Sequence, residues 1–365
     1  NTHMKKILTT TAAVALTASS AAAGGLDRTG LFLGDLFAEG SVVKLSFGSV
    51  NPSISGTGFA AVGGGTFNDV GNNYTQTALS FKNDLNDRVS YLVSIDQPYG
   101  VDVEYPGSGA ATALGGTMAK VDSSAVTFVG RYKFGNGFSV HGGLRAQKIE
   151  GEVTLSGLAY GAANGYNLNT ESGTEVGYLV GGAYERPDIA LRIALTYNSD
   201  IEYELDAVDL SGAHIVETST PESWNLEFQS GVAEDTLVFG SIRWAAWGDF
   251  SVPAAGLGGV DLVDLDDSTD YVLGVARRFN ESLVGLVSLQ YEAEGDPLVS
   301  PLAPTNGKLG ITIGGQYALS DGVTLSGGVN YTRLGDAQPQ TADTARADFT
   351  DNDSVGIGFS VAYNF

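Results

Sequence analysis

Bulky and small residues alternate along this chain in repeated runs, and this pattern limits the possible folds more than any other feature. It is clearest in residues 355–365, where every odd position is large and apolar and every even position is Gly, Ser, Ala or Asn. A strand of this length and period can cross a membrane at a tilt. Since its small face carries no charge, we interpret the run as a lipid-facing strand; a soluble sandwich strand would show charge on its solvated face.

The connectors between these runs support the same interpretation. Short and long connectors alternate without a break, as in outer-membrane barrels with tight periplasmic turns and long extracellular loops. We therefore predict an all-β fold, a fourteen-stranded antiparallel transmembrane β-barrel with both ends of the chain in the periplasm. A soluble β-sandwich has no reason to alternate its loops in this way. The predicted strands are approximately 41–50, 74–82, 89–97, 120–133, 138–149, 175–185, 189–198, 223–232, 236–247, 269–278, 283–294, 308–318, 323–334 and 354–365.

The first residues have the pattern of a secretory signal peptide. Two lysines open a basic segment, an apolar run covers 7–16, and small residues follow up to an A-x-A-type site at Ala23. The apolar run is too short for a spanning helix. We predict a signal peptide over residues 1–23, of which 1–3 resemble a non-native start. An exported chain with barrel-type strands is expected in the outer membrane of a Gram-negative cell.

Composition and histidine content exclude several function classes. The formal net charge of −23 gives no electrostatic basis for binding nucleic acid. The sequence has no cysteine, so it has no disulfide framework in spite of the predicted export. No run of roughly eighteen apolar residues exists, which excludes a helical membrane protein. After the predicted leader only His141 and His214 remain, without the spacing of a metal site or the third group of a triad. We predict no enzymatic activity, no cofactor and no metal site.

Three stretches together resemble the sequences of a known family in order and length. Residues 241–250 (SIRWAAWGDF) end in a tryptophan, a small residue and an aromatic, and residues 190–199 (ALRIALTYNS) reach Tyr-x-Ser before a long loop. Residues 120–150 match the family in length and in the position of the turn. Over most of the chain the sequence resembles the FadL-type outer-membrane transporters of long-chain fatty acids and other hydrophobic compounds. The resemblance implies fourteen strands with an N-terminal hatch that plugs the barrel.

The segment before the first strand is the candidate hatch. Residues 24–40 lack alternation, and they are too few for a domain and too apolar for a tail. We predict that they form a short hatch inside the barrel of residues 41–365. The family's hatch often carries an Asn-Pro-Ala triplet, whereas the nearest match here is 51–53 (Asn-Pro-Ser), after the first strand. The gating of the hatch therefore does not follow from the resemblance.

The third predicted strand ends in a sequence that can interrupt β-pairing. Pro98 cannot donate a ladder hydrogen bond, and Gly100 permits unusual dihedral angles. In the FadL family this strand carries an inward kink that opens the wall sideways to the bilayer. The resemblance thus implies a lateral gate at Gln97, Pro98, Tyr99 and Gly100. The alternative is that these residues simply begin the second long loop.

Four cations on lumen-facing positions are candidate substrate-binding residues. A carrier of hydrophobic acids needs an apolar pocket and a cation that meets the carboxylate. Strand phase places these cations among residues too small for lipid contact: Arg145, Arg192, Arg243 and Lys308. We predict that they bind substrate together with the apolar hatch residues Leu33 and Phe37. The alternative is that the cations pair with strand carboxylates such as Glu227 or Glu292.

Two functions are compatible with this pattern. The first is passive, substrate-selective uptake of long-chain fatty acids or other hydrophobic compounds through a plugged barrel, with lateral release into the bilayer. The alternative is a general diffusion porin, which is expected to carry rings of charge at an open constriction. The apolar hatch favours uptake of hydrophobic compounds, and a plugged barrel should show little steady current in planar bilayers.

Further expectations concern partners. Acidic residues gather in the long loops, either as a solvated surface or as sites where divalent cations bridge to lipopolysaccharide. Phe365 is expected to be recognised by the barrel-assembly machinery, because it ends the last predicted strand with an aromatic ring. We expect a monomer surrounded by outer-membrane lipid.

Overall fold

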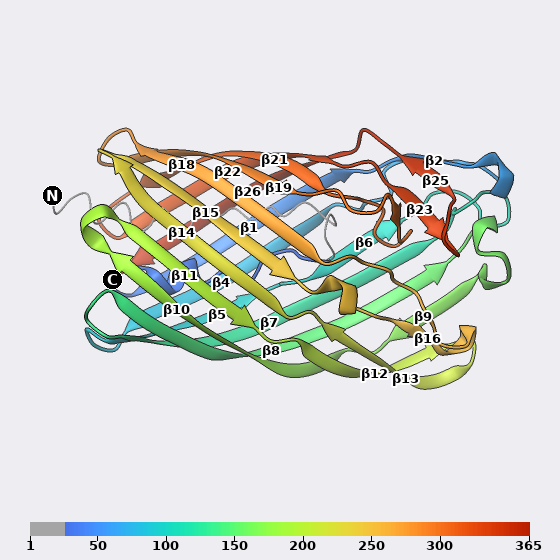
Figure 1. The fold of residues 1–365 in the computed structure, drawn as a ribbon, viewed down its shortest axis with the longest axis horizontal. Helices are drawn as coiled ribbons and strands as arrows, with labels where there is room; N and C mark the ends of the chain where they lie inside the picture. The colour runs from blue at the N-terminus through green and yellow to red at the C-terminus, as the bar shows by residue number, and fades with distance from the viewer. Residues whose placement is uncertain (1–25) are drawn as a thin grey trace.

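The structure, a computed structural model, describes residues 26–365 and is a closed antiparallel barrel (Figure 1). The predicted signal peptide, residues 1–23, lies outside the described residues. The cylinder closes because β1 pairs with β26 along its whole length. The predicted all-β, fourteen-stranded barrel is therefore confirmed. The barrel strands are β1 (Val42–Ser53), β4 (Tyr74–Asp84), β5 (Val89–Asp96), β7 (Met118–Lys133), β8 (Phe138–Leu155), β10 (Gly173–Arg186), β11 (Leu191–Asn198), β14 (Ser223–Ala233), β15 (Thr236–Ala245), β18 (Ser268–Arg278), β19 (Leu283–Glu292), β21 (Lys308–Ala318), β22 (Val323–Leu334) and β26 (Asp353–Asn364).

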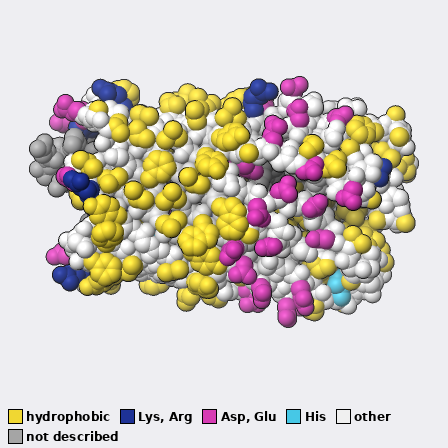
Figure 2. Space-filling view, in the orientation of Figure 1, with side chains coloured by type: hydrophobic (Ala, Val, Ile, Leu, Met, Phe, Trp, Pro, Cys, Tyr) yellow, Lys and Arg dark blue, Asp and Glu magenta, His cyan; other side chains and the backbone are white. Residues whose placement is uncertain are grey.

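The alternation in the sequence corresponds to the two faces of the barrel wall. In β26, Ile357 and Phe359 are exposed on the outside, whereas Gly358 and Ser360 are buried on the inside. Figure 2 shows apolar side chains as a broad belt over the visible face, with acidic side chains gathered beyond it towards one end. A belt of this kind matches the hydrocarbon layer of a bilayer. Within residues 26–365, no helix has the length and apolar character needed to cross a membrane.

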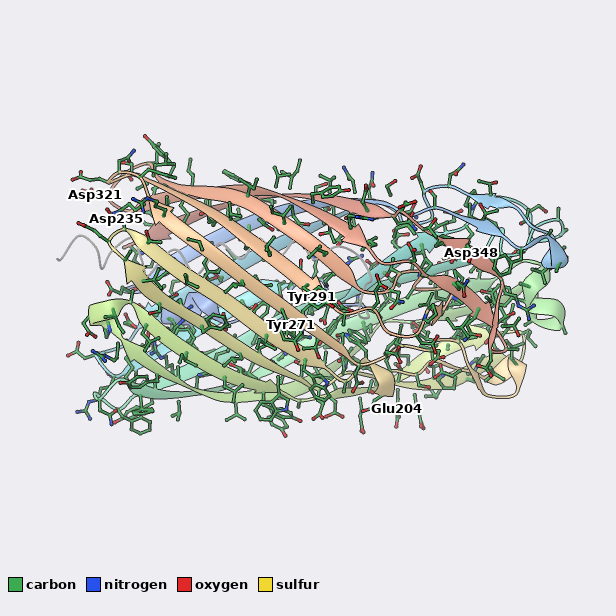
Figure 3. The ribbon with its side chains drawn as sticks, turned by 45° about the horizontal axis from the view of Figure 1, so that its top comes forward. Glu204, Asp235, Tyr271, Tyr291, Asp321 and Asp348 are labelled. Atoms are coloured by element: carbon green, nitrogen blue, oxygen red, sulfur yellow. The ribbon has the colours of Figure 1, made fainter. Side chains whose placement is uncertain are left out.

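The two ends of the barrel differ in the length of their connections. Short turns join the strands at the end where Asp235 and Asp321 lie, which we call the turn end (Figure 3). Long connections, including those that carry Glu204 and Asp348, lie at the opposite end, the loop end. The alternation of connector lengths predicted from the sequence is thus present in the structure.

The long connections contain short strands and turns of helix that the sequence pattern did not reveal. A hairpin of β12 and β13 lies between β11 and β14, and β12 also pairs with β9. The expectation of plain loops here is wrong, because these strands pair with each other, with other connections or with extended wall strands. They are β2 (Gly56–Gly58), β3 (Thr66–Phe67), β6 (Gly100–Glu104), β9 (Tyr166–Thr170), β12 (Ile201–Asp209), β13 (Gly212–Thr220), β16 (Pro253–Ala254), β17 (Val260–Asp261), β20 (Leu298–Val299), β23 (Gln338–Thr341), β24 (Thr344–Ala345) and β25 (Ala347–Phe349). The 3-10 helices are η1 (Gly34–Phe37), η2 (Ala60–Val62), η3 (Leu158–Ala163), η4 (Pro187–Ile189), η5 (Trp247–Asp249) and η6 (Ala255–Leu257).

A buried carboxylate fastens the tip of the β12–β13 hairpin. Asp209 accepts hydrogen bonds from the Tyr166 hydroxyl at 2.6 Å, from the Ser211 hydroxyl at 2.6 Å and from the Gly256 N–H at 2.7 Å. Burial alone raises the pKa of Asp209, but these hydrogen bonds outweigh it and hold the pKa below its usual range. The hairpin is therefore tied to two other long connections.

Apolar side chains fill the lumen towards the loop end. The largest cluster includes Trp247 and Leu302, which come from different connections. Residues 300–308 are buried throughout, and the Tyr105 hydroxyl donates to the Pro301 carbonyl oxygen at 2.7 Å. The connection between β19 and β21 thus folds into the barrel instead of pointing away from it.

Candidate functional site

The barrel wall is interrupted between β4 and β5. The two strands pair only from Asp84 as far as Leu79, which lies opposite Ile95. On the edge of β4 that faces β5, residues 74–78 have no ladder partner in the part of the chain that the structure describes. An interrupted ladder inside a membrane barrel is unusual, because hydrocarbon cannot satisfy free backbone groups.

The interruption coincides with the residues predicted to form a lateral gate. β5 ends at Asp96 and the chain resumes as β6 at Gly100, while both pair with β7. The chain advances four residues over this step, whereas β7 advances three, from Ala125 to Asp122. One extra residue therefore bulges from the strand, at a place where Pro98 has no N–H to donate.

The N-terminal segment, residues 26–29, lies antiparallel to residues 98–100 at this interruption. The Leu26 carbonyl oxygen accepts the Gly100 N–H at 2.9 Å, and the Arg28 N–H donates to the Pro98 carbonyl oxygen at 2.8 Å. An antiparallel bridge joins the residues between them. The backbone groups freed by the bulge thus bond to the start of the predicted hatch.

Gly100 lies directly against the guanidinium end of the Arg28 side chain. A Cβ at this position would lie 2.3 Å from Arg28 Cζ, and the backbone φ is not in the left-handed region. The expectation that Gly100 serves unusual dihedral angles is therefore wrong. The Arg28 guanidinium lies 4.3 Å from the centre of the Tyr74 ring and 3.9 Å from Asp122.

Asp27 fixes the N-terminal segment to the opposite wall. Arg243 donates to its two carboxylate oxygens at 2.8 and 3.2 Å, and Trp247 Nε1 donates at 3.2 Å. The ring of Tyr99, a predicted gate residue, packs edge-on against Trp247 with centroids 5.3 Å apart. Arg243 also donates to Ser223 and to a neighbouring amide oxygen. The structure therefore gives this predicted substrate cation a partner within the hatch.

A second predicted cation also has carboxylate partners. Lys308 Nζ lies 2.9 Å from Asp270 Oδ2 and 3.2 Å from Glu292 Oε2. Its side chain is almost fully buried, so the two carboxylates balance its charge inside the lumen. Lys308 therefore pairs with strand carboxylates, which is the alternative to substrate binding for this residue.

The other two predicted cations have no ion pair with any described residue. Arg145 donates to the Thr127 hydroxyl and to the Asn198 amide oxygen, both at 3.2 Å. Arg192 lies 4.7 Å from the centre of the Phe37 ring and is buried. These two guanidinium groups thus differ from Arg243 and Lys308 in having no carboxylate within 4.0 Å.

The predicted hatch residues Leu33 and Phe37 are buried against the inner wall. Together with Leu36 they pack on Leu92 and Val129, which face the lumen from β5 and β7. A second guanidinium, from the wall, also lies over the Phe37 ring. The η1 turn is therefore held by apolar contacts on one side and by cation–π contacts on the other.

Two lysines that the sequence pattern did not single out also bind the segment predicted to be the hatch. Lys44 pairs with Asp35 at 2.6 Å, and Lys82 donates to the carbonyl oxygens of Ala38 and Gly40 at 2.7 and 2.8 Å. Both lysines stand on the small-residue phase of their strands. That phase is the signal that could have identified them.

A cavity of about 200 Å³ lies beside the interrupted ladder. Its lining includes inward-facing serines of the wall and four residues whose side chains are exposed on the outside. The outward-facing lining residues are Phe47, Thr77, Leu79 and Ile357. The cavity therefore reaches both faces of the wall, and we call it the side cavity.

Carboxylates dominate the charge of the side cavity. Asp35, Asp96 and Glu227 line it, and its lining cation, Lys44, already pairs with Asp35. The Thr29 hydroxyl donates to Asp96 at 3.0 Å. An anionic ligand would meet repulsion here, whereas an uncharged apolar ligand would not.

A larger cavity, about 1280 Å³, lies between the hatch and the turn end. Phe37 and Arg192 line it on the hatch side, and the strand-joining turns line it on the other side. The predicted hatch thus separates this vestibule from the apolar clusters of the loop half.

Comparison with known proteins agrees with this architecture. The sequence profile of a family described as "Outer membrane protein transport protein (OMPP1/FadL/TodX)" matches residues 36–365. No curated protein sequence matches the chain at a significant level.

Several solved structures share the fold. A Pseudomonas aeruginosa FadL homologue is 12% identical with a TM-score of 0.73, over 91% of this chain and 92% of its own. The Pseudomonas putida toluene transporter TodX is 16% identical with a TM-score of 0.64, over 90% of each chain. The Ralstonia pickettii toluene transporter TbuX is 14% identical with a TM-score of 0.60, over 93% of this chain and 92% of its own. At these identities the likeness shows a common fold.

Proposed function

Because this chain belongs to the OMPP1/FadL/TodX family of outer membrane transport proteins, we propose that it takes up hydrophobic compounds passively and releases them sideways into the bilayer. In this proposal the gate consists of Gln97, Pro98, Tyr99 and Gly100, and the N-terminal segment holds it closed. The general diffusion porin is not favoured, because the apolar hatch and the buried connection 300–308 occupy the lumen.

The side cavity is the observation that carries the proposal. It lies where the ladder between β4 and β5 stops, and it is lined from both faces of the wall. A hydrophobic molecule that leaves through the wall stays in an apolar medium. Exit into water instead costs roughly 0.8 kcal/mol per methylene, or about 12 kcal/mol for a sixteen-carbon chain. Sideways release avoids that barrier.

The cargo proposed from the resemblance is a long-chain fatty acid. Its carboxylate would be met by lumen cations among Arg145, Arg192, Arg243 and Lys308, with Leu33 and Phe37 beside the chain. Arg145 and Arg192 suit this role better, since the other two already have carboxylate partners.

An uncharged hydrocarbon is the second candidate cargo. The three carboxylates of the side cavity favour it, because they repel an anion and leave a neutral molecule unaffected. The structural relatives TodX and TbuX carry the description of toluene transporters, which is consistent with this choice.

A replacement of residues 96–100 by a regular alternating strand sequence tests the proposal. Uptake of radiolabelled palmitate and of toluene by whole cells should then fall to the background of cells without the protein. Heat-modifiable electrophoretic mobility should stay normal. A matched control replaces 161–165, an exposed stretch of a long connection. Undiminished uptake in the first variant would point to an axial pore.

The proposal includes three kinds of partner. Outer-membrane lipid contacts the apolar belt, and lipopolysaccharide headgroups meet the acidic side chains next to it (Figure 2). The barrel-assembly machinery recognises the last strand through Phe365. The chain acts as a monomer, and its cargo passes through one barrel.

A further inference from the structure

Where the ladder between β4 and β5 stops, a backbone amide of β4 bonds to a side chain instead of a main chain. The Thr77 N–H donates to Gln97 Oε1 at 3.2 Å, within the normal range for an N–H···O bond. Leu79 pairs with Ile95, so a continued register would place Thr77 directly opposite residue 97. The Gln97 side chain therefore takes the place that its own carbonyl oxygen would have in a regular antiparallel ladder.

The main chain that follows Gln97 is held away from β4 by other partners. The Tyr99 N–H donates to the Ser123 hydroxyl at 2.9 Å, and this hydroxyl donates to the Tyr99 carbonyl oxygen at 2.7 Å. The Pro98 carbonyl oxygen accepts N–H groups of the N-terminal segment. The main chain is thus occupied on β7 and on the N-terminal segment, and the side chain of Gln97 is what reaches β4.

Thr77 lies at the depth of the apolar belt. Phe47, which is opposite Thr77 in β1, and Leu79 are both exposed on the outer face. Thr77 is exposed on the same face, and it lines the side cavity. Hydrocarbon offers no acceptor to a backbone N–H, so the Gln97 oxygen satisfies this edge of the wall while the gate is closed.

We propose that Gln97 is a gating residue, whose hydrogen bond to the Thr77 N–H closes the side cavity towards the bilayer. Rotation of the Gln97 side chain breaks this bond and opens the wall. The inference rests on the proposed function, because it requires that cargo leaves between β4 and β5. Side chains change rotamer far faster than strands rearrange. The ladder between β5 and β7 stays intact during such a rotation, so the barrel keeps its shape while cargo passes.

Hydrogen exchange of the Thr77 amide, measured by NMR on the purified protein in detergent micelles, tests the bond without any cargo. Gln97→Leu keeps a similar volume and removes the acceptor, so this amide should exchange about three- to tenfold faster, as expected for the loss of one ordinary hydrogen bond. Gln97→Glu keeps an acceptor oxygen at the same distance from the backbone and should retain the slow exchange. Unchanged exchange in Gln97→Leu would overturn the proposal.

Toluene uptake by whole cells tests the gating role. Toluene has no charge, so its electrostatic energy does not depend on the residue at position 97. Because exit then no longer requires rotation of Gln97, Gln97→Leu should raise the initial uptake rate severalfold, and Gln97→Glu should restore the slower rate. Faster Thr77 exchange without faster uptake would overturn the gating role. Failure of the proposed function gives a different result, since replacement of residues 96–100 would then leave uptake undiminished.

A double-variant cycle separates this hydrogen bond from general loosening of the wall. Thr77→Pro removes the donor at a strand edge without a ladder partner, where proline is tolerated, and it should raise uptake as Gln97→Leu does. Both substitutions remove the same bond, so the combined variant should be no faster than either one alone. Additive increases would overturn the proposal. The matched control, Thr75→Pro, lies on the same edge outside the side-cavity lining and should leave uptake unchanged. Heat-modifiable electrophoretic mobility verifies that each variant is folded.

Discussion

Gly100 is the residue at which the barrel wall and the N-terminal segment come closest. In Gly100→Ala the new methyl group would stand 2.3 Å from Arg28 Cζ, so the guanidinium would have to shift from its place over Tyr74. We expect this shift to loosen the N-terminal segment at the interruption. Planar-bilayer recordings of the variant should show a steady current well above that of the unmodified protein.

The control for this substitution is Gly130→Ala. Gly130 lies in β7, and the nearest atom to an added Cβ is 4.0 Å away, with no strain from φ. The steady planar-bilayer current of the Gly130→Ala variant should equal that of the unmodified protein. If Gly100→Ala is equally silent, the N-terminal segment does not close the wall.

Asp27 makes the shortest ion pair of the N-terminal segment. Asp27→Asn leaves Arg243, which is 3% exposed, without its charge partner. Removing one member of a buried ion pair costs about 3–5 kcal/mol. We expect this loss to lower the free energy with which the N-terminal segment binds to the barrel wall. Hydrogen exchange of the Arg28 and Gly100 amides should then become faster, while barrel amides such as that of Val129 stay protected.

A compensating variant separates charge from shape. Asp27→Leu combined with Arg243→Met removes both charges and keeps apolar volume, so it should recover much of the protection. If the double variant exchanges as fast as Asp27→Asn, the ion pair is not what holds the segment.

At the level of elements, the last strand closes the barrel. The Phe365 N–H donates to the Ser41 carbonyl oxygen at 3.0 Å, and its ring stacks near Tyr363 and Phe81, with centroids 5.8 and 6.4 Å away. Phe365→Ala should lower the amount of folded, heat-modifiable protein in the outer membrane. Phe134→Ala, which removes an exposed turn aromatic, should have no such effect. Normal yields of the first variant would contradict recognition of the terminal aromatic.

Wall strands were predictable because each one separates two different surroundings. β21 and β22 begin and end where the alternation predicts, since their outward side chains meet lipid and their inward ones meet the lumen. The strand β12 also alternates, yet the pattern of connector lengths predicts a loop there. Its position depends on pairing with β9 and β13, and no local pattern specifies such partners.

The candidate site was predictable in part. Strand phase identifies Arg243 and Lys308 as inward-facing, because a charge cannot face lipid. It cannot identify the partner of Arg243, since Asp27 lies 216 residues earlier in a segment without regular period. The interruption at Pro98 was expected from its missing N–H and from the resemblance. The role of Arg28 beside Gly100 depends on tertiary packing alone.

For the whole molecule, the orientation in the membrane is a separate prediction. Single cysteines at Asp264 and Asp343 mark the loop end, and those at Asn136 and Asp321 mark the turn end. An impermeant maleimide added to whole cells should label the first pair and leave the second unlabelled until the cells are lysed. Labelling of the second pair alone would reverse the proposed orientation.

The pairing of residues 26–29 with 98–100 has a practical consequence for anyone who modifies this protein. Without it, the Gly100 N–H and the Pro98 carbonyl oxygen lose their partners in the buried interior, at about 1–3 kcal/mol per group. A bare strand edge also recruits other chains and promotes aggregation. Gly161 is exposed and has open space around it, so an epitope inserted there should leave the protein foldable.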